Sequence, residues 1–173
     1  MREFLLKIAR KAIEDPNFVP KEIPEEAKEK RGVFVTITIN GKLRGCIGFP
    51  LPIYPLWEGV IKAARAAAYN DPRFPPLDPS EFKDIKIEIS ILTVPKELKG
   101  NPEDFPKKVK IGKDGLIVEY DGYSGLLLPQ VATEFGLNSK EFLDETCLKA
   151  GLPPGCWKYA KVYKFQAEII SED

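Results

Sequence analysis

The 173-residue sequence contains no histidine and only three cysteines, Cys46, Cys147 and Cys156. Without an imidazole, the chain cannot form a Ser-His-Asp or Cys-His catalytic arrangement, or a zinc or iron site with histidine ligands. The cysteines form no Cys-x-x-Cys pair, and an odd number in an intracellular chain argues against a disulfide framework. The glycine patterns of dinucleotide-binding and phosphate-binding loops are also missing. We therefore expect no metal and no cofactor.

An excess of charge of either sign is also absent, since 26 Lys and Arg residues balance 26 Asp and Glu residues. This balance argues against nucleic acid as the main partner. The longest stretch without a charged residue, residues 45–57, is shorter than the roughly 20 residues that span a bilayer. The N-terminus lacks the apolar segment of a signal peptide. We expect a cytoplasmic protein with no membrane contact.

Apolar periodicity, with proline and glycine as boundaries, predicts a series of short elements. Helices are predicted at residues 2–15, 56–69 and 130–135, and from Asn138 or Ser139 to residue 150. Strands are predicted at residues 33–39, 42–49, 85–91, 116–120, 124–128 and 161–170. The dipeptide Asn40-Gly41 predicts a type I′ hairpin turn. Helices that do not strictly alternate with strands indicate an α+β fold, with a largely antiparallel sheet flanked by helices.

The most unusual segment is Leu-Arg-Gly-Cys-Ile-Gly at residues 43–48. On a strand, Arg44 and Cys46 point to one face, where the cation would anchor an anion and favour the thiolate. Gly45 and Gly48 leave the backbone bare, so that a ligand or a second backbone could approach closely. A small buried thiol in a strand kinked by glycine is the alternative interpretation.

Three more charged residues are candidates for a site. Glu88 lies mid-strand with Ser90 on the same face, where it could act as an acid or base or hold Arg44 in a bidentate pair. The alternative for Glu88 is a solvated polar face. Asp71 and Arg73 lie in a turn held by prolines, and such rigid turns often bind ligands. The alternative for this pair is a helix stop with an ion pair.

The other two cysteines, nine residues apart, carry no strong functional signal. Cys147 falls on the inner side of the last predicted helix, with Phe142 and Leu143, and we expect it in the core rather than reactive. Cys156 precedes Trp157 and could anchor the last loop. In the final predicted strand, Tyr163, Phe165, Ala167 and Ile169 are expected on one face.

Six blocks of residues, taken in order, resemble the AMMECR domain family. They are residues 31–36, 43–48, 71–77, 88–93, 125–132 and 146–152. The sequence is similar to stand-alone archaeal members, and the resemblance covers nearly the whole chain. It implies one domain over residues 1–173, with two lobes and a cleft lined by residues 43–48. Gln130, in the fifth block, becomes a further candidate ligand-binding residue. Phe49 stands where the family usually has threonine.

The resemblance implies no settled reaction and leaves two classes of function open. The first is an enzyme, or a binder of small molecules or peptides, acting beside radical-SAM and Memo-type proteins. In this hypothesis Arg44 anchors an anion, Cys46 is the nucleophile or thiolate contact, and Glu88 is the acid–base group. The second is a non-catalytic interaction or regulatory module that uses the proline-rich residues 50–57. A nucleic-acid-associated factor of transcription, replication, repair or translation is a third hypothesis, which the zero net charge disfavours.

Overall fold

The computed structural model describes all residues, 1–173, and the chain forms two compact units. Unit 1 comprises Met1–Leu92 and Glu168–Asp173, and unit 2 comprises Thr93–Ala167. The strand pairs within each unit are antiparallel, which confirms the predicted α+β fold with a largely antiparallel sheet. None of the helices has both the length and the apolar character needed to cross a lipid bilayer.

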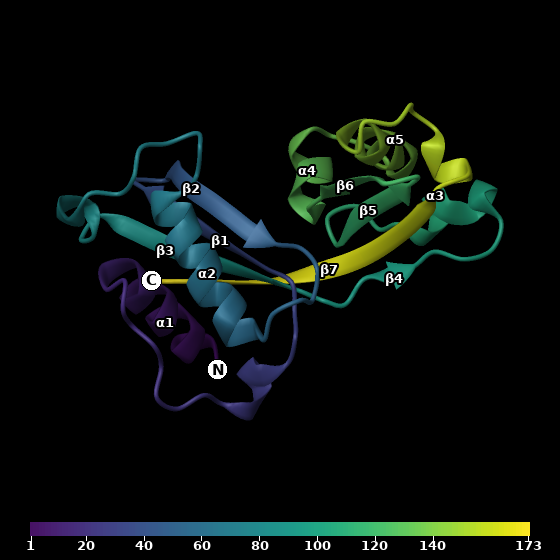
Figure 1. Cartoon of the computed structure of the whole chain (residues 1–173). Helices are drawn as coiled ribbons and strands as arrows, with labels where there is room; N and C mark the ends of the chain where they lie inside the picture. The colour runs from purple at the N-terminus through teal and green to yellow at the C-terminus, as the bar shows by residue number, and fades with distance from the viewer. The chain divides into compact units, whose positions relative to one another are not determined.

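Unit 1 is a sheet with two helices on one face (Figure 1). Its helices are α1 (Arg2–Glu14) and α2 (Leu56–Tyr69), and its strands are β1 (Val33–Ile39), β2 (Lys42–Phe49) and β3 (Ile85–Leu92). Strand β1 pairs with β2 on one side and with β3 on the other. The predicted hairpin between β1 and β2 is confirmed, since Asn40 and Gly41 have φ angles of 51° and 77°.

The core of unit 1 lies between the sheet and the helices. Alternate residues of β1, namely Val33, Val35 and Ile37, are fully buried and pack with the apolar faces of α1 and α2. Burial of one such side chain stabilises the fold by about 1.5–3 kcal/mol. The intervening residues of β1 therefore lie on the sheet face away from the helices.

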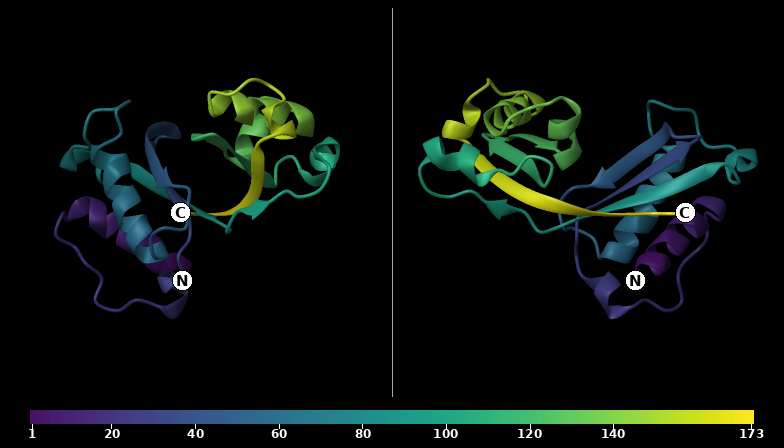
Figure 2. Two further views of the ribbon diagram at one scale, coloured as in Figure 1. Left: turned by 45° about the vertical axis from the view of Figure 1, so that its right-hand side comes forward. Right: turned by 180° about the vertical axis from the view of Figure 1, so that it is seen from behind.

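Unit 2 contains a hairpin with two helices packed against it (Figure 2). Its strands are β4 (Lys96–Glu97), β5 (Asp114–Tyr120), β6 (Tyr123–Leu127) and most of β7 (Lys161–Ser171), and its helices are α3 (Phe105–Lys108), α4 (Pro129–Glu134) and α5 (Ser139–Lys149). Strand β5 pairs with β6 and β7, and β4 pairs with β7. Asn138 caps α5 in a capping box with Glu141, and Gly151 follows with φ of 80°.

The expectation that the cysteines form no disulfide is wrong, because Cys147 and Cys156 are bonded to each other. The turn at Gly151 reverses the chain after α5 and brings the two Cα atoms to 5.9 Å, within disulfide range. The expected place of Cys147 in the core is confirmed, since it is fully buried with Phe142 and Leu143. Cysteine number and compartment alone did not reveal this pairing.

Burial along β7 does not follow the alternation expected from its sequence. Its buried residues are Val162, Phe165 and Ile170, whereas Ile169 is 50% exposed. Val162 belongs to the core of unit 2 and Ile170 to the core of unit 1. Because the residues of β7 belong to two separate cores, one alternation of buried and exposed residues does not hold along the whole strand.

Candidate functional site

Three polar side chains form one row across the sheet of unit 1. Cys46 on β2 is the register partner of Thr36 on β1, and Thr36 is in turn the partner of Glu88 on β3. All three are half-buried and lie on the face away from the helices, because the residues on either side of each of them face the core or α2. These flanking residues are Val35 and Ile37 beside Thr36, Ile87 and Ile89 beside Glu88, and Gly45 beside Cys46. Two strand spacings place Cys46 and Glu88 about 10 Å apart along this row.

Cys46 carries the only free thiol of the chain, since the other two cysteines are bonded to each other. Its Sγ atom lies 3.2 Å from Oγ1 of Thr36, and either atom can be the donor in this hydrogen bond. A thiolate at this position would accept a hydrogen bond from the Thr36 hydroxyl. Thr36 was not predicted as a site residue, although its outward place in the alternation of β1 is visible in the sequence.

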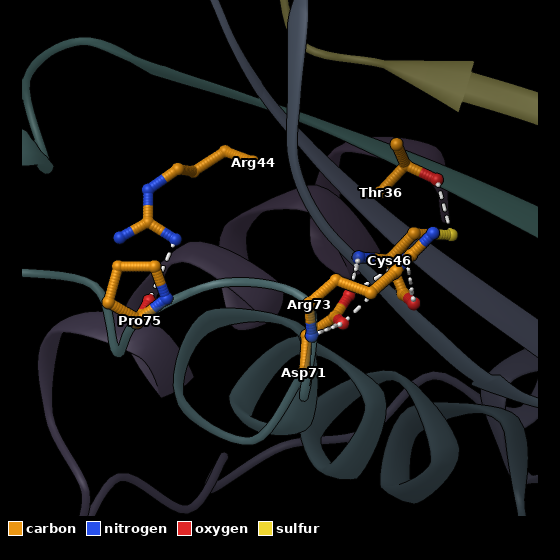
Figure 3. A network of polar contacts seen from close by, with 6 residues as sticks. All are labelled: Thr36, Arg44, Cys46, Asp71, Arg73 and Pro75. Atoms are coloured by element: carbon orange, nitrogen blue, oxygen red, sulfur yellow. Dashed lines mark hydrogen bonds and ion pairs between the residues drawn. The ribbon is translucent and has the colours of Figure 1, made fainter.

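Asp71 and Arg73 bind the backbone of Cys46 at the free edge of β2. Asp71 Oδ2 accepts a hydrogen bond of 3.0 Å from the Cys46 N–H, and Arg73 Nη2 donates one of 3.3 Å to the Cys46 carbonyl. Arg73 also donates from Nε and Nη2 to Asp71, at 3.1 and 2.8 Å. Figure 3 shows this pair beside Cys46. The turn that carries Asp71 and Arg73 thus binds the main chain of Cys46 as a neighbouring strand would.

The electrostatics of the pair follow from these contacts. Asp71 is only 4% exposed, and the hydrogen bond from Arg73 holds the pKa of its carboxyl well below the usual range. The same hydrogen bond raises the pKa of Arg73, while burial acts in the opposite direction. The Arg73 side chain is 55% exposed and its Nη1 has no partner. Arg73 is therefore an accessible cation beside the thiol.

Arg44 does not pair with Glu88 as expected. Its Nε and Nη2 donate to the two carboxylate oxygens of Glu81, at 3.0 and 3.1 Å, and its Nη1 donates to the Pro75 carbonyl at 2.9 Å (Figure 3). The pKa of Glu81 is lowered, chiefly by this pair. Because its guanidinium is occupied in this way, Arg44 fastens the segment between Asp71 and Glu81 to β2.

The two candidate glycines of β2 are sites of close packing. A side chain on Gly45 would collide with the main-chain carbonyl of Ala67, so this glycine lets α2 approach the strand. A side chain on Gly48 would collide with the ring of its cross-strand partner Phe34. Gly45 thus meets a second backbone, which is one of the alternatives that the sequence left open. Gln130 lies on α4 in unit 2, and its role in ligand binding stays a prediction.

No group of three or more Cys, Asp or Glu side chains is arranged to hold a metal ion. The structure brings together Cys46, Thr36, Glu88, Asp71 and Arg73. Arg44 lies next to this group and binds the segment that follows Asp71 and Arg73, through Pro75 and Glu81. This arrangement offers a thiol, a hydroxyl, a carboxylate and a cation on one sheet face and its edge. It suits binding through hydrogen bonds and charge, and nucleophilic chemistry at sulfur.

A family model described as AMMECR1 matches residues 6–170. The chain belongs to the AMMECR1 family. A protein of Pyrococcus furiosus is 55% identical over 184 residues, which cover 99% of this chain and 88% of that protein. A protein of Thermococcus gammatolerans is 53% identical over 186 residues, which cover 99% of this chain and 90% of that protein.

The fold is also similar to a crystal structure, that of an uncharacterized protein from Pyrococcus horikoshii. The TM-score is 0.88 at 52% sequence identity, and the match covers 99% of this chain and 91% of that one. The resemblance read from six sequence blocks is therefore confirmed. Membership of the AMMECR1 family brings no reaction with it, so the function has to be argued from the site itself.

Proposed function

We propose that the row of Cys46, Thr36 and Glu88 is the floor of a binding site for a small molecule or peptide, with Cys46 as its nucleophile. The observation that supports this proposal is the register, which aligns a thiol, a hydroxyl and a carboxylate on one face. A ligand about 10 Å long lying over Thr36 would contact Cys46 at one end and Glu88 at the other. This floor includes the segment that would line the cleft implied by the family resemblance.

Two groups lie next to Cys46. The Thr36 hydroxyl can donate to the sulfur, and Arg73, which is paired with Asp71, presents its guanidinium at the strand edge. In an acyl transfer, the thiolate of Cys46 would form a bond to the acyl carbon. The bond from that carbon to the leaving group would break, and the leaving group would take a proton from water. Glu88 would accept a hydrogen bond from the ligand or exchange a proton with it.

The ligand proposed for this site carries an anionic group. Arg73 presents the unpartnered Nη1 next to Cys46, and a carboxylate or phosphate is the natural partner of a guanidinium. Arg73 thereby takes the anchoring role that the sequence assigned to Arg44, whose donors are occupied by Glu81 and Pro75.

Two alkylating agents of nearly the same shape test this proposal. Iodoacetate carries a carboxylate and iodoacetamide does not, so their rate ratio at Cys46 reports the local charge. We expect the ratio to exceed that of the uncharged reference thiol N-acetylcysteine amide by about threefold or more at low salt. The variant Arg73→Met should lower the ratio to the free-thiol value, and Arg73→Lys should retain it.

A matched pair of variants distinguishes the effect of the Thr36 hydroxyl on Cys46 from the effect of any threonine-to-valine replacement in β1. Thr36→Val should change the alkylation rate of Cys46, whereas Thr38→Val, on the same strand and face, should leave it unchanged. A rate ratio equal to that of N-acetylcysteine amide, and unaffected by Arg73→Met, would contradict an anion-binding thiol site.

A second candidate function is favoured by the loop between β2 and α2. Leu51 and Ile53 are 48% and 58% exposed there, and the loop is braced by an edge-to-face contact between Phe49 and Tyr54. Such exposed apolar residues suit a non-catalytic interaction module. Radical-SAM and Memo-type proteins are the partners that the resemblance implies. Binding to either purified protein that disappears in the Leu51→Ser/Ile53→Ser variant would support this function, and no binding would contradict it.

A further inference from the structure

A hollow of unit 1, of about 430 Å³, lies between α1 and the segment that follows it. Its apolar lining includes Phe4 and Ile8 from α1, and Phe18 and Val19 from the following segment. Ile8 is only 3% exposed and lies deep, whereas Val19 is 68% exposed. None of its lining residues belongs to the strands that carry Cys46, Thr36 and Glu88, so this groove is separate from the site proposed above.

The wall of the groove is fixed by Arg65 of α2. Its Nε donates to the carbonyl of Ala12 at 3.1 Å, and its Nη2 donates to the carbonyls of Asp15 and Phe18 at 3.2 and 2.9 Å. One guanidinium therefore fastens both the end of α1 and the returning segment. A groove held in this way needs little rearrangement to bind, which lowers the entropic cost of association.

Positive charge surrounds the apolar lining. Lys7, Lys11 and Lys21 line the groove, and none of them forms an ion pair within the chain. The one acidic residue of the lining is Glu22, so the groove carries an excess of two positive charges in a chain whose net charge is zero. The Nζ atom of Lys11 lies 5.7 Å from the centre of the Phe18 ring, at the junction of the apolar and basic parts.

We propose that this groove binds a short acidic segment of a partner protein, in which apolar side chains alternate with Asp or Glu. The apolar side chains would contact Phe4, Ile8 and Phe18, and the carboxylates would face the unpaired lysines. The concave shape favours a peptide over a membrane, because a flat bilayer surface does not reach a recessed residue such as Ile8.

The probe is the peptide Glu-Leu-Asp-Phe-Glu-Leu-Asp-amide with fluorescein on its N-terminal amine, titrated with the full chain in a fluorescence anisotropy assay. We expect a Kd of about 100 µM or tighter at low salt, weakening as salt is raised. Lys7→Glu/Lys11→Glu should weaken binding about tenfold, and Val19→Ser about threefold. The matched control Lys42→Glu/Lys83→Glu removes the same charge elsewhere in unit 1 and should leave the Kd within about twofold.

Three results would overturn the proposal. They are the absence of peptide binding at low salt, equal loss of binding in the groove variant and its control, and equal binding of a peptide with lysine in place of each acidic residue. Vesicles containing phosphatidylglycerol serve as the comparison. Vesicle binding that depends on Lys7 and Lys11, with no peptide binding, would assign the surface to a membrane instead.

Discussion

Asp71 is the residue whose replacement tests the construction of the site most sharply. Its buried carboxylate accepts four hydrogen bonds, from the Cys46 and Arg73 main-chain N–H groups and from Nε and Nη2 of Arg73. In Asp71→Asn, the amide removes the charge and replaces one acceptor with a donor that faces other donors. Because Arg73 is more than half exposed, most of the cost comes from the hydrogen bonds rather than from the charge pair. The expected loss is about 2 kcal/mol of unfolding free energy.

A loss of this size corresponds to a fall in Tm of roughly 4–8 °C for a chain of this length. The measurement is thermal unfolding at pH 7, followed by circular dichroism, for the parent protein, Asp71→Asn and Asp84→Asn. Asp84 is exposed and forms no side-chain hydrogen bond, so its replacement is the matched control. An Asp71→Asn variant that melts at the same temperature as the control would show that the Asp71 hydrogen bonds do not stabilise the fold.

The pH dependence of this difference gives an independent check. The pKa of Asp71 is lower in the folded protein than in the unfolded chain, so its ionisation stabilises the fold. That stabilisation is fully present above the unfolded value of about 4 and is lost as the pH falls toward the lower folded pKa. The difference between the parent and Asp71→Asn should therefore be constant from about pH 5 to 8 and shrink below about pH 4. A difference that grows on acidification would contradict the assigned pKa shift.

Three other replacements have defined outcomes. Gly45→Ala should cost about 3 kcal/mol in urea unfolding, because the added methyl group meets the Ala67 carbonyl; a neutral effect would contradict the close approach of α2. Cys147→Ser/Cys156→Ser should lower the urea midpoint and cost roughly 2–3 kcal/mol, because a cross-link between residues nine apart is lost; an unchanged midpoint would contradict the disulfide. Arg44→Met should free the turn at the edge of β2 and accelerate exchange of the Cys46 amide about tenfold in deuterium exchange; an unchanged rate would show that the turn holds without it.

Most elements of unit 1 could be predicted because their signals are local. The alternation of β-branched residues in β1 and the dipeptide Asn40-Gly41 define a hairpin without reference to the rest of the chain. The alanine-rich α2 has the predicted bounds, Leu56–Tyr69.

In unit 2, the two-residue β4 and the four-residue α3 were not predicted, since elements this short have no measurable periodicity.

The partners of the site residues could be predicted only in part. The sequence placed Arg44 and Cys46 on one strand, and Asp71 and Arg73 in one turn. It did not show that the turn would lie along the edge of β2 at Cys46. Which carboxylate meets a given arginine depends on how a loop folds back in space, and no spacing rule encodes this.

The pairing of Glu81 with Arg44 illustrates the limit of prediction from sequence alone. Glu81 closes a capping box that begins at Asp78, and its side chain accepts a hydrogen bond from the Asp78 N–H. Its second role, as the bidentate partner of Arg44, comes from tertiary structure. Glu88 remained a candidate because it lies in the same register row as Cys46, a relation that becomes visible once the strand order is known.

In the proposed function, Cys46, Thr36 and Glu88, with Arg73 at the edge, form one ligand site. A disulfide-tethering screen tests this site, because Cys46 is the only free thiol and captures fragments in proportion to their fit. We expect the selected fragments to carry an anionic group, Glu88→Gln and Arg73→Met to abolish their selection, and Thr38→Val to preserve it. If fragments are captured no better than by a free thiol, and all three variants retain the same fragments, these residues do not form one ligand site.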